Sequence, residues 1–174
     1  MTKRRDRPPR RLPPARRPYR RGVGIVLINP AGLVFAGQRI DRFHEAWQMP
    51  QGGIDKDEAA DAAALRELEE ETGIRPALVE LIAESRDWLR YDLPDALMDE
   101  VWGGRYRGQE QKWYAARFLG RDRDIDVETA HQEFQTWRWA RPAELIETIV
   151  PFKRPLYEAV LGEFAPYLES AKKF

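Results

Sequence analysis

Short apolar runs separated by turn residues and charges dominate the pattern along this chain. The length and alternation of these runs predict strands at residues 22–28, 33–38, 78–85, 88–92, 111–119 and 134–140. The first two strands are joined by a turn at residues 29–32, where Asn, Pro and Gly occur together. A polar loop is expected at residues 39–45 and an irregular surface insertion at residues 94–107.

Helical periodicity is found in the middle and at the end of the chain. An Ala-rich stretch predicts a helix that is capped by Asp55 or Asp57 and ends at a left-handed Gly73. A short helix is expected from Pro142, followed by a longer amphipathic helix over residues 151–170. Its apolar stripe is expected to pack in the core and consists of Phe152, Leu156, Val160, Phe164 and Leu168.

These elements predict the fold class and the number of domains. Strands before and after a central helix, with another helix at the end, favour an α/β fold in which a mixed sheet is sandwiched between helices. With 174 residues, 43% of them hydrophobic, the chain is long enough for one well-packed domain.

Several classes of protein are disfavoured by what the sequence lacks. No apolar run approaches the roughly 20 residues needed to span a bilayer, so no membrane association is expected. The basic N-terminus is not followed by the apolar segment of a secretory signal. Because the chain has no cysteine, it has neither disulfides nor thiolate metal sites. We therefore expect a cytoplasmic protein.

Charge is distributed unevenly although the formal net charge is zero. Residues 1–21 hold ten of the 29 Lys and Arg but one of the 29 Asp and Glu, so this segment carries +9 and the rest −9. Residues 1–18 are rich in Arg and Pro, which predicts a disordered basic arm before a domain at residues 19–174. The arm could attract the phosphates of a nucleic acid or dock on the acidic body of its own chain. Both interpretations stay open.

Four carboxylates occupy five positions at the end of the predicted central helix. They repel one another and face the negative end of the helix dipole, where anions are disfavoured. Glu67, Glu70 and Glu71 project from one face of the helix, and a divalent cation would relieve their repulsion. Oxygen ligands favour a hard ion such as Mg²⁺ or Mn²⁺. The alternative is a solvent-exposed acidic surface that binds nothing.

The spacing around this cluster resembles the signature of the Nudix hydrolases, G-x5-E-x7-R-E-U-x-E-E-x-G-U, where U is apolar. The matching residues are Gly52, Glu58, Arg66, Glu67, Leu68, Glu70, Glu71, Gly73 and Ile74. Nine fixed positions over 23 residues make a chance match negligible. The resemblance implies the α/β/α Nudix fold and metal-dependent hydrolysis of a phosphoric anhydride bond.

The resemblance also implies roles for particular residues. The expected metal ligands are Glu67, Glu70, Glu71 and Glu133. Either Glu67 or Glu133 would remove a proton from the attacking water, and Arg66 would complete the catalytic set by orienting the neighbouring glutamates. Glu58 is expected to cap the helix or to support the ligands. His44 and His131 stand alone in polar stretches and are expected to be surface residues.

Sequences that flank the signature resemble one branch of this family, which contains bacterial RNA 5′-pyrophosphohydrolases and diadenosine polyphosphate hydrolases. Basic side chains there would pair with phosphates, and one or two aromatic rings would stack on a base. The candidates for substrate contact are Arg20, Arg39, Gln51, Gly52, Gly53, Tyr91, Lys112, Phe134, Phe152 and Lys153. For any single charged residue, a solvated surface position is the alternative.

Three functions are compatible with these residues. The first is an RNA pyrophosphohydrolase that converts a 5′-triphosphate end to a 5′-monophosphate, and the basic arm modestly favours it. The second is a dinucleoside polyphosphate hydrolase that cleaves diadenosine tetraphosphate or pentaphosphate. The third is an inactive nucleotide-binding module, which the intact set of glutamates disfavours. We expect a monomer, and no activating protein partner can be inferred.

Overall fold

An eight-stranded mixed sheet forms the centre of the protein. A computed structural model of the protein describes residues 11–173. The strands are β1 (Tyr19–Ile28), β2 (Val34–Arg39), β3 (Trp47–Gln48), β4 (Gln51–Gly53), β5 (Val79–Glu84), β6 (Leu89–Asp92), β7 (Gly108–Phe118) and β8 (Phe134–Ala140). The α-helices are α1 (Ala60–Thr72), α2 (Asp95–Met98), α3 (Pro142–Thr148), α4 (Arg154–Glu163) and α5 (Ala165–Ala171). The 3-10 helices are η1 (Pro14–Arg16), η2 (Pro76–Leu78), η3 (Val101–Gly104), η4 (Asp122–Asp124) and η5 (Pro151–Lys153).

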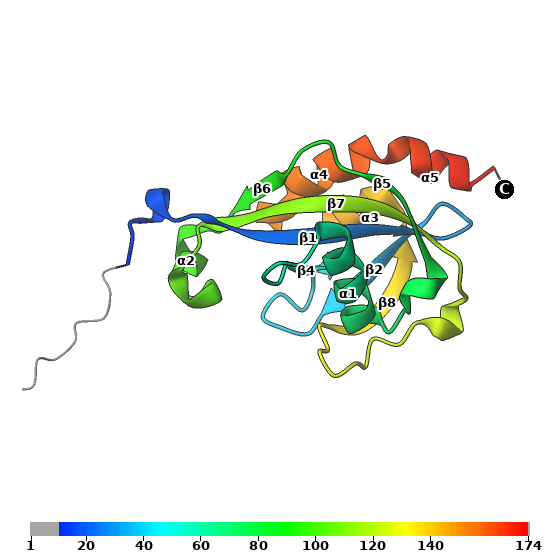
Figure 1. The fold of residues 1–174 in the computed structure, drawn as a ribbon, viewed down its shortest axis with the longest axis horizontal. Coiled ribbons are helices and arrows are strands. Elements are labelled where there is room, and N and C mark those ends of the chain that lie inside the picture. The colour runs from blue at the N-terminus through cyan, green and yellow to red at the C-terminus, as the bar shows by residue number, and fades with distance from the viewer. Residues whose placement is uncertain (1–10, 174) are drawn as a thin grey trace, which may run out of the picture.

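Helices cover both faces of this sheet (Figure 1). Along β1 the side chains alternate between the two faces. Val23, Ile25 and Leu27 pack under α1, whereas Val26 and Ile28 pack under α3, α4 and α5. The predicted α/β class, with a mixed sheet between layers of helices, is confirmed.

The order of the strands places the end of α1 next to the start of β1. The main path through the sheet is β3-β2-β1-β7-β5, while β4 pairs with β1, β6 with β7 and β8 with β2. Strands β1 and β7 run parallel, from the pair Tyr19 and Gly108 to the pair Ile28 and Arg117, and the other pairs are antiparallel. Because β4 lies on β1 and leads into α1, the signature residues are gathered at this end of the sheet.

The helix α1 packs as its small-residue face predicts, but its start differs from the prediction. Ala63, Ala64 and Leu68 are fully buried against the sheet, and Gly73 ends the helix at φ 70° with a left-handed conformation. The residue at the N-cap is Ala59, which makes no side-chain capping bond. The prediction that Asp55 or Asp57 caps this helix is therefore wrong, because the N-cap position lies two residues after Asp57 and four residues after Asp55.

The helix predicted over residues 151–170 is interrupted at two prolines. Pro155 and Pro166 lack the N–H group that a continuous helix needs, so the segment divides into η5, α4 and α5. The apolar stripe survives these breaks, since Leu156, Val160, Phe164 and Leu168 are buried in the core. Within residues 11–173, no helix combines the length and the apolarity that crossing a bilayer requires.

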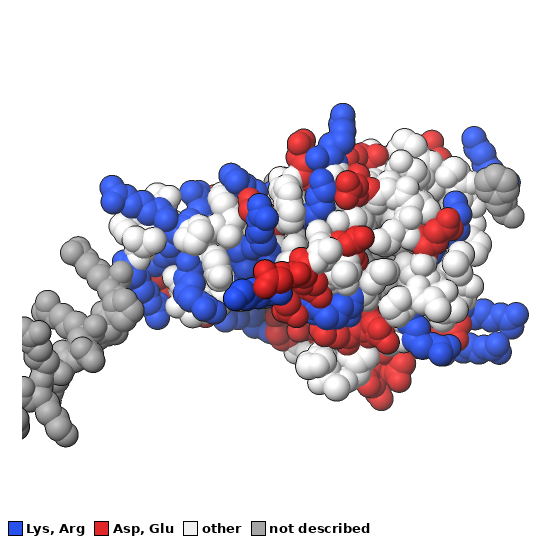
Figure 2. All heavy atoms as spheres, viewed as in Figure 1, with Lys and Arg blue, Asp and Glu red and all other residues white. Residues whose placement is uncertain are grey.

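Two segments that were expected to be irregular have defined structure. Residues 94–107 contain α2 and η3. Residues 11–18 lie against this segment, and Arg17 among them is buried and donates a buried hydrogen bond to Met98. This part of the predicted arm is therefore ordered. Residues 1–10 of the predicted arm lie outside the described residues. Figure 2 shows Lys and Arg side chains crowded at the end of the molecule that carries the N-terminal segment and α2.

Candidate active site

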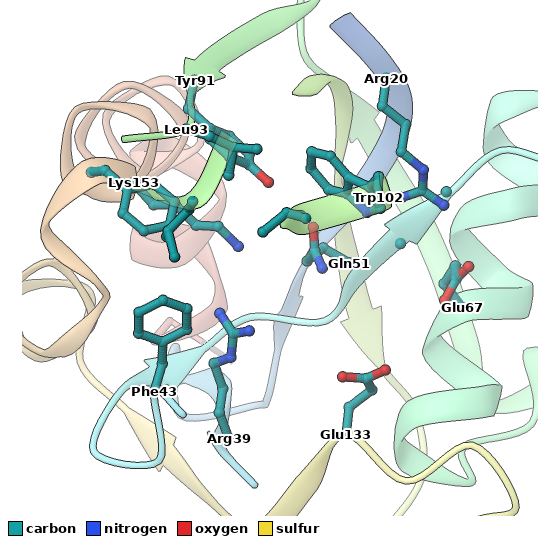
Figure 3. Close-up of a pocket in the computed structure, with 15 residues that line it drawn as sticks. Arg20, Arg39, Phe43, Gln51, Glu67, Tyr91, Leu93, Trp102, Glu133 and Lys153 are labelled. Atoms are coloured by element: carbon teal, nitrogen blue, oxygen red, sulfur yellow. The ribbon is translucent and has the colours of Figure 1, made fainter. Parts of the chain in front are cut away.

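A cavity of about 340 Å³ opens between the start of β1, the strand β4 and the end of α1. Glu67 and Glu133 border one side of it, and Arg39 and Lys153 border the other (Figure 3). The cavity therefore has an acidic and a cationic side that face each other. This arrangement suits a ligand that carries several phosphates, provided that something neutralises the acidic side.

Two glycines of β4 allow side chains to approach the backbone closely. A Cβ on Gly52 would overlap the carboxylate of Glu67, and a Cβ on Gly53 would overlap the guanidinium of Arg20. Neither glycine has a positive φ, and both are paired with β1 in the sheet. They are needed for this close approach and not for a turn.

Arg66 ties the loop before α1 to the carboxylates of the helix. Its Nε and Nη2 donate to the two oxygens of Glu58 over 2.7 and 2.8 Å, and Nη2 also donates to the carbonyl oxygen of Gly53 over 2.9 Å. Its Nη1 donates to Glu67 over 3.0 Å and to Glu70 over 3.3 Å. The guanidinium lowers the pKa of Glu58 to about 2. Glu58 thus stays charged and holds Arg66 in a fixed orientation.

Three acidic side chains in or behind the cavity have pKa values above the usual range. Burial strongly raises the pKa of Glu71, and the charges of Glu67 and Glu133 raise it further. Loss of hydration raises the pKa of Glu67 although Arg66 donates to it. Glu133 lies at the exposed mouth of the cavity, where partial loss of hydration also raises its pKa. These carboxyl groups therefore resist ionising together.

This donor set fits a divalent cation that would be bound together with other ligands. Within residues 11–173, no three His, Cys, Asp or Glu side chains lie close enough together to hold an ion by themselves. Part of the coordinating capacity of Glu67 and Glu70 is taken up by Arg66. A hard divalent ion would remove the repulsion that adds to the effect of burial on the pKa of Glu71, and phosphate oxygens could complete its coordination.

Lys153 and Arg39 form the cationic side of the cavity. The buried Lys153 donates from Nζ to Oε1 of Gln48 over 3.1 Å and lies 5.1 Å from the centre of the Tyr91 ring. Burial lowers its pKa to about 7, with a further contribution from the charge of Arg39. Arg39 donates to the same Gln48 oxygen over 3.3 Å and lies 5.0 Å from the centre of the Phe43 ring. An anionic ligand would stabilise the charged form of Lys153.

A row of glutamines supports the floor of the cavity. Nε2 of Gln111 donates to Oε1 of Gln51 over 2.7 Å and to Oε1 of Gln109 over 3.0 Å. The hydroxyl of Tyr91 donates to the same oxygen of Gln109 over 3.0 Å. In the part of the chain that the structure describes, Nε2 of Gln109 is the one buried side-chain nitrogen or oxygen without a partner. The row fixes Gln51 and Tyr91, which both line the cavity.

Comparison with known proteins shows the family to which the chain belongs. A family model described as the NUDIX domain matches residues 18–160, which include β4, α1 and Glu133. The chain belongs to the NUDIX family. Proteins named RNA pyrophosphohydrolase are similar in sequence to this chain along nearly their whole length. The relative from Roseobacter denitrificans is 58% identical over 154 residues (88% of this chain and 96% of the relative). The relative from Zymomonas mobilis is 51% identical over 150 residues (86% and 97%).

Solved structures share the NUDIX fold at low sequence identity. The crystal structure of a binary complex of an Ap4A hydrolase from C. elegans matches with a TM-score of 0.63 and 21% identity, over 86% of this chain and 98% of that chain. The dihydroneopterin triphosphate pyrophosphohydrolase of E. coli matches with a TM-score of 0.63 and 20% identity, over 82% and 96%. At these identities the likeness concerns the fold, and the predicted Nudix fold is confirmed.

Most of the predicted site residues meet in the NUDIX cavity. The predicted residues that line it are Arg20, Arg39, Gln51, Gly52, Gly53, Glu67, Tyr91, Glu133, Phe152 and Lys153. Glu71 does not line the cavity but is buried behind it, where it accepts a hydrogen bond from the backbone N–H of Gln51 over 3.2 Å. Glu70 lies beside Arg66, half-exposed. Their roles as metal ligands stay predictions.

Two predicted substrate contacts lie elsewhere in the NUDIX domain. Phe134 is fully buried on the α1 side of the sheet, where its ring packs 6.1 Å from the ring of Phe35. Lys112 donates from Nζ to the carbonyl oxygen of Arg86 over 3.3 Å, away from the cavity. Strand alternation turns these side chains to other surroundings. The full burial of Phe134 corrects its prediction, whereas Lys112 does not line the cavity and its contact with substrate stays a prediction. His44 and His131 are exposed, as expected.

Several cavity residues of the NUDIX site were missed by sequence reasoning. Phe43 comes from the predicted polar loop, and Leu97, Val101 and Trp102 come from the predicted surface insertion. Two signals point to them in hindsight. An aromatic residue interrupts the polar loop, and Leu97 and Val101 stand four residues apart, which is the spacing of one apolar helical face.

Proposed function

We propose that this NUDIX protein is an RNA pyrophosphohydrolase, which removes pyrophosphate from the 5′-triphosphate end of RNA and leaves a 5′-monophosphate. The observation that carries the proposal is the cavity in which glutamates face arginine, lysine and aromatic side chains. Relatives named RNA pyrophosphohydrolase, at 51–58% identity over most of the chain, support the same reaction. We further propose that the protein acts in the cytoplasm as a monomer.

The cationic and aromatic side of the cavity would bind the substrate. The guanidinium of Arg20, beside Trp102, and on the cationic side the guanidinium of Arg39 and the amine of Lys153 are suited to pair with phosphate oxygens. The rings of Phe43 and Phe152 lie 6.1 Å apart, edge to face, on the same side. They offer a surface on which a base can stack. Charge would therefore fix the phosphate chain while the rings hold the nucleoside.

The acidic side would hold the cofactor. Glu67, Glu70, Glu71 and Glu133 are the residues that would bind Mg²⁺, Mn²⁺ or a similar ion. Such an ion, when bound, neutralises phosphate charge and polarises the phosphorus that is attacked. Arg66 would keep the carboxylates in place from behind, since it is held in turn by the charged Glu58.

A carboxylate of this chain would take the proton from the attacking water. Glu67 and Glu133 are the candidates because both line the cavity. Their raised pKa values make them stronger bases than a glutamate with the ordinary pKa. Glu67 accepts a hydrogen bond from Arg66, and among the described residues Glu133 accepts none from it. Comparing Glu67→Gln with Glu133→Gln by the pH dependence of kcat would separate the two.

Dinucleoside polyphosphates are a second candidate substrate. Aromatic side chains occur at two places around the cavity. Trp102 lies beside Arg20, and Phe43 lies beside Arg39 (Figure 3), with the ring of Phe152 6.1 Å from that of Phe43. Two such places could each take one base of diadenosine tetraphosphate while the polyphosphate lies between them. An inactive binding module is disfavoured because every glutamate of the signature is present.

Side-by-side initial rates would test the proposal. A short 5′-triphosphorylated RNA and diadenosine tetraphosphate are compared at physiological salt with Mg²⁺, and again with EDTA. We expect release of pyrophosphate or phosphate from the RNA, lost with EDTA and restored by Mg²⁺. Hydrolysis of the dinucleotide alone would favour the second candidate, and hydrolysis of neither would reject both. If removal of residues 1–10 slows the RNA reaction alone, the basic arm contacts RNA.

A further inference from the structure

The guanidinium of Arg17 is buried at the back of the wall of the cavity. Its side chain is 5% exposed and does not line the cavity. Nη1 donates to the carbonyl oxygen of Met98 over 2.9 Å, and Nη2 donates to Oδ1 of Asp99 over 2.7 Å. Nε donates to the carbonyl oxygen of Leu12 over 3.0 Å. Arg17 therefore joins the N-terminal segment to the end of α2 through two hydrogen bonds, and the third ties it to Leu12 within its own segment.

The segment held by Arg17 forms one wall of the cavity. We call residues 95–107 the wall segment; it contains α2 and η3 and contributes Leu97, Val101 and Trp102 to the lining. In Figure 3 Trp102 lies beside Arg20, and the Arg20 guanidinium is 5.4 Å from the centre of its ring. The position of the wall segment thus sets the position of an aromatic and of a cationic side chain in the cavity.

The wall segment has a backbone that cannot hold its shape alone. Trp102 has φ 50°, in the left-handed region where a bulky side chain is an outlier. Gly103 and Gly104 follow with φ 66° and 71°. The helix α2 spans four residues, far fewer than an isolated helix needs for stability. Such a conformation persists only where surrounding contacts determine it.

Contacts from residues 11–18 supply this support. Besides the bonds of Arg17, Nη1 of Arg11 donates to the carbonyl oxygen of Asp99 over 3.3 Å. The backbone N–H of Arg107 donates to the carbonyl oxygen of Pro18 over 3.1 Å. Arg17 is the buried member of this set, and a buried charge-assisted hydrogen bond contributes more than an exposed one.

We propose that Arg17 is a positioning residue of the substrate cavity, which acts by holding the wall segment so that Trp102 faces the substrate. This inference rests on the proposed function, because it concerns how the same cavity binds a nucleotide. Arg17 does not touch the substrate. Its loss would loosen the wall segment and weaken substrate binding, while the glutamates on α1 would remain in place.

Kinetics of four single variants and one double variant would test the proposal. Arg17→Met removes the three hydrogen bonds, Arg17→Lys restores one of them, and Arg16→Met removes a neighbouring exposed arginine as a matched control. For Arg17→Met we expect KM to rise about 5- to 50-fold with kcat changed less than about twofold. Arg17→Lys should lie between it and the wild type, and Arg16→Met should match the wild type. In the fourth variant, Trp102→Ala, adding Arg17→Met should have little further effect on KM.

Amide hydrogen exchange separates this inference from the proposed function. In Arg17→Met, or in Arg17→Lys if the first variant does not fold, exchange should be faster in residues 95–107 than in the wild type and unchanged in α1. An unchanged KM in a folded Arg17 variant, or additive effects of Arg17→Met and Trp102→Ala, would overturn the positioning role. If the wild type hydrolyses neither substrate, the proposed function fails. The exchange result then decides alone whether Arg17 holds the wall segment.

Discussion

Gly52 and the carboxylate of Glu67 lie so close together that a Cβ at position 52 would overlap the carboxylate. The contact joins β4 to the last turns of α1. It explains why glycine is needed at this place although its backbone has no positive φ. The absence of a side chain at position 52 sets the distance between β4 and α1. It therefore also sets the direction in which Glu67 enters the cavity.

Gly52→Ala is therefore expected to damage the site more than the fold. The added methyl group must displace Glu67 or the whole end of α1. We expect kcat/KM to fall by about 100-fold, the cost of a misplacement on the order of 1 Å. The melting temperature should fall by a few degrees only. Steady-state kinetics and thermal unfolding of the same preparation would measure both.

Gly162→Ala provides the matched control. Gly162 lies exposed in α4, and a Cβ there would meet nothing within 4 Å. Because alanine favours helix over glycine, the free energy of unfolding should rise by up to about 1 kcal/mol, with activity unchanged. Wild-type activity in Gly52→Ala would contradict the importance of the close approach.

Glu70→Gln is expected to abolish turnover while the fold stays intact. The amide keeps the size of the side chain but removes the charge that a metal ion would need. We expect a loss in kcat of at least about 100-fold, with little change in the circular dichroism spectrum. Glu69→Gln is the control, because Glu69 is exposed on the same helix. Near-wild-type rates of Glu70→Gln with saturating Mg²⁺ would remove Glu70 from the site.

Binding of substrate should depend on the charge of Lys153. The pKa of Lys153 is lowered to about 7 by burial, so in the free enzyme the amine loses its charge as the pH rises through 7. We expect kcat/KM to decline on the alkaline side of this value. Glu67, Glu71 and Glu133, whose pKa values are raised, should give a decline on the acidic side. Measurement of kcat/KM from pH 5 to 9 would show both limbs.

Lys153→Met should remove the alkaline limb and leave the acidic limb. At pH 6, where the wild-type amine is charged, KM of the variant should be higher by about tenfold or more. At pH 9 the two proteins should converge. Lys112→Ala should behave as the wild type at every pH, because Lys112 lies away from the cavity. An alkaline limb that persists in Lys153→Met would assign it to another group.

The same substitution should raise stability at low pH. The pKa of Lys153 is lower in the folded state than in the unfolded state, so the unfolded chain binds the extra proton between about pH 7 and the ordinary lysine pKa. Below pH 7 the buried charge therefore lowers the free energy of unfolding by its full amount. As the pH rises above 7, this lowering becomes smaller. Lys153→Met should melt several degrees above the wild type at pH 6, with a smaller difference at pH 9. An equal difference at both values would contradict the lowered pKa.

Local patterns in the sequence were sufficient for six of the eight strands and for the signature, whereas the short strands β3 and β4 were not predicted. Alternation and turn residues placed β1, β5, β6, β7 and β8 with errors only at their ends. The spacing of glutamates along α1 indicated the chemistry, because residues three and four apart share a helical face. The relatives and the family model support what this spacing predicted.

Tertiary contacts decided the rest of the site. The spacing of Leu97 and Val101 indicates an apolar face, but the place of residues 94–107 in the wall of the cavity follows from the docking of Arg17 on Met98 and Asp99. Phe134 and Lys112 match a pattern of substrate contacts, yet the sheet turns both away from the cavity.

The sequence alone determined which side chains have the chemistry to bind metal and phosphate, because side-chain chemistry and helical spacing are local properties. Which of them share one cavity was decided by the pairing of β4 with β1 and of β1 with β7. The tertiary fold also decided the burial that lowers the pKa of Lys153 and raises the pKa of Glu71. Desolvation depends on neighbours brought together from distant parts of the chain, and no local pattern encodes it.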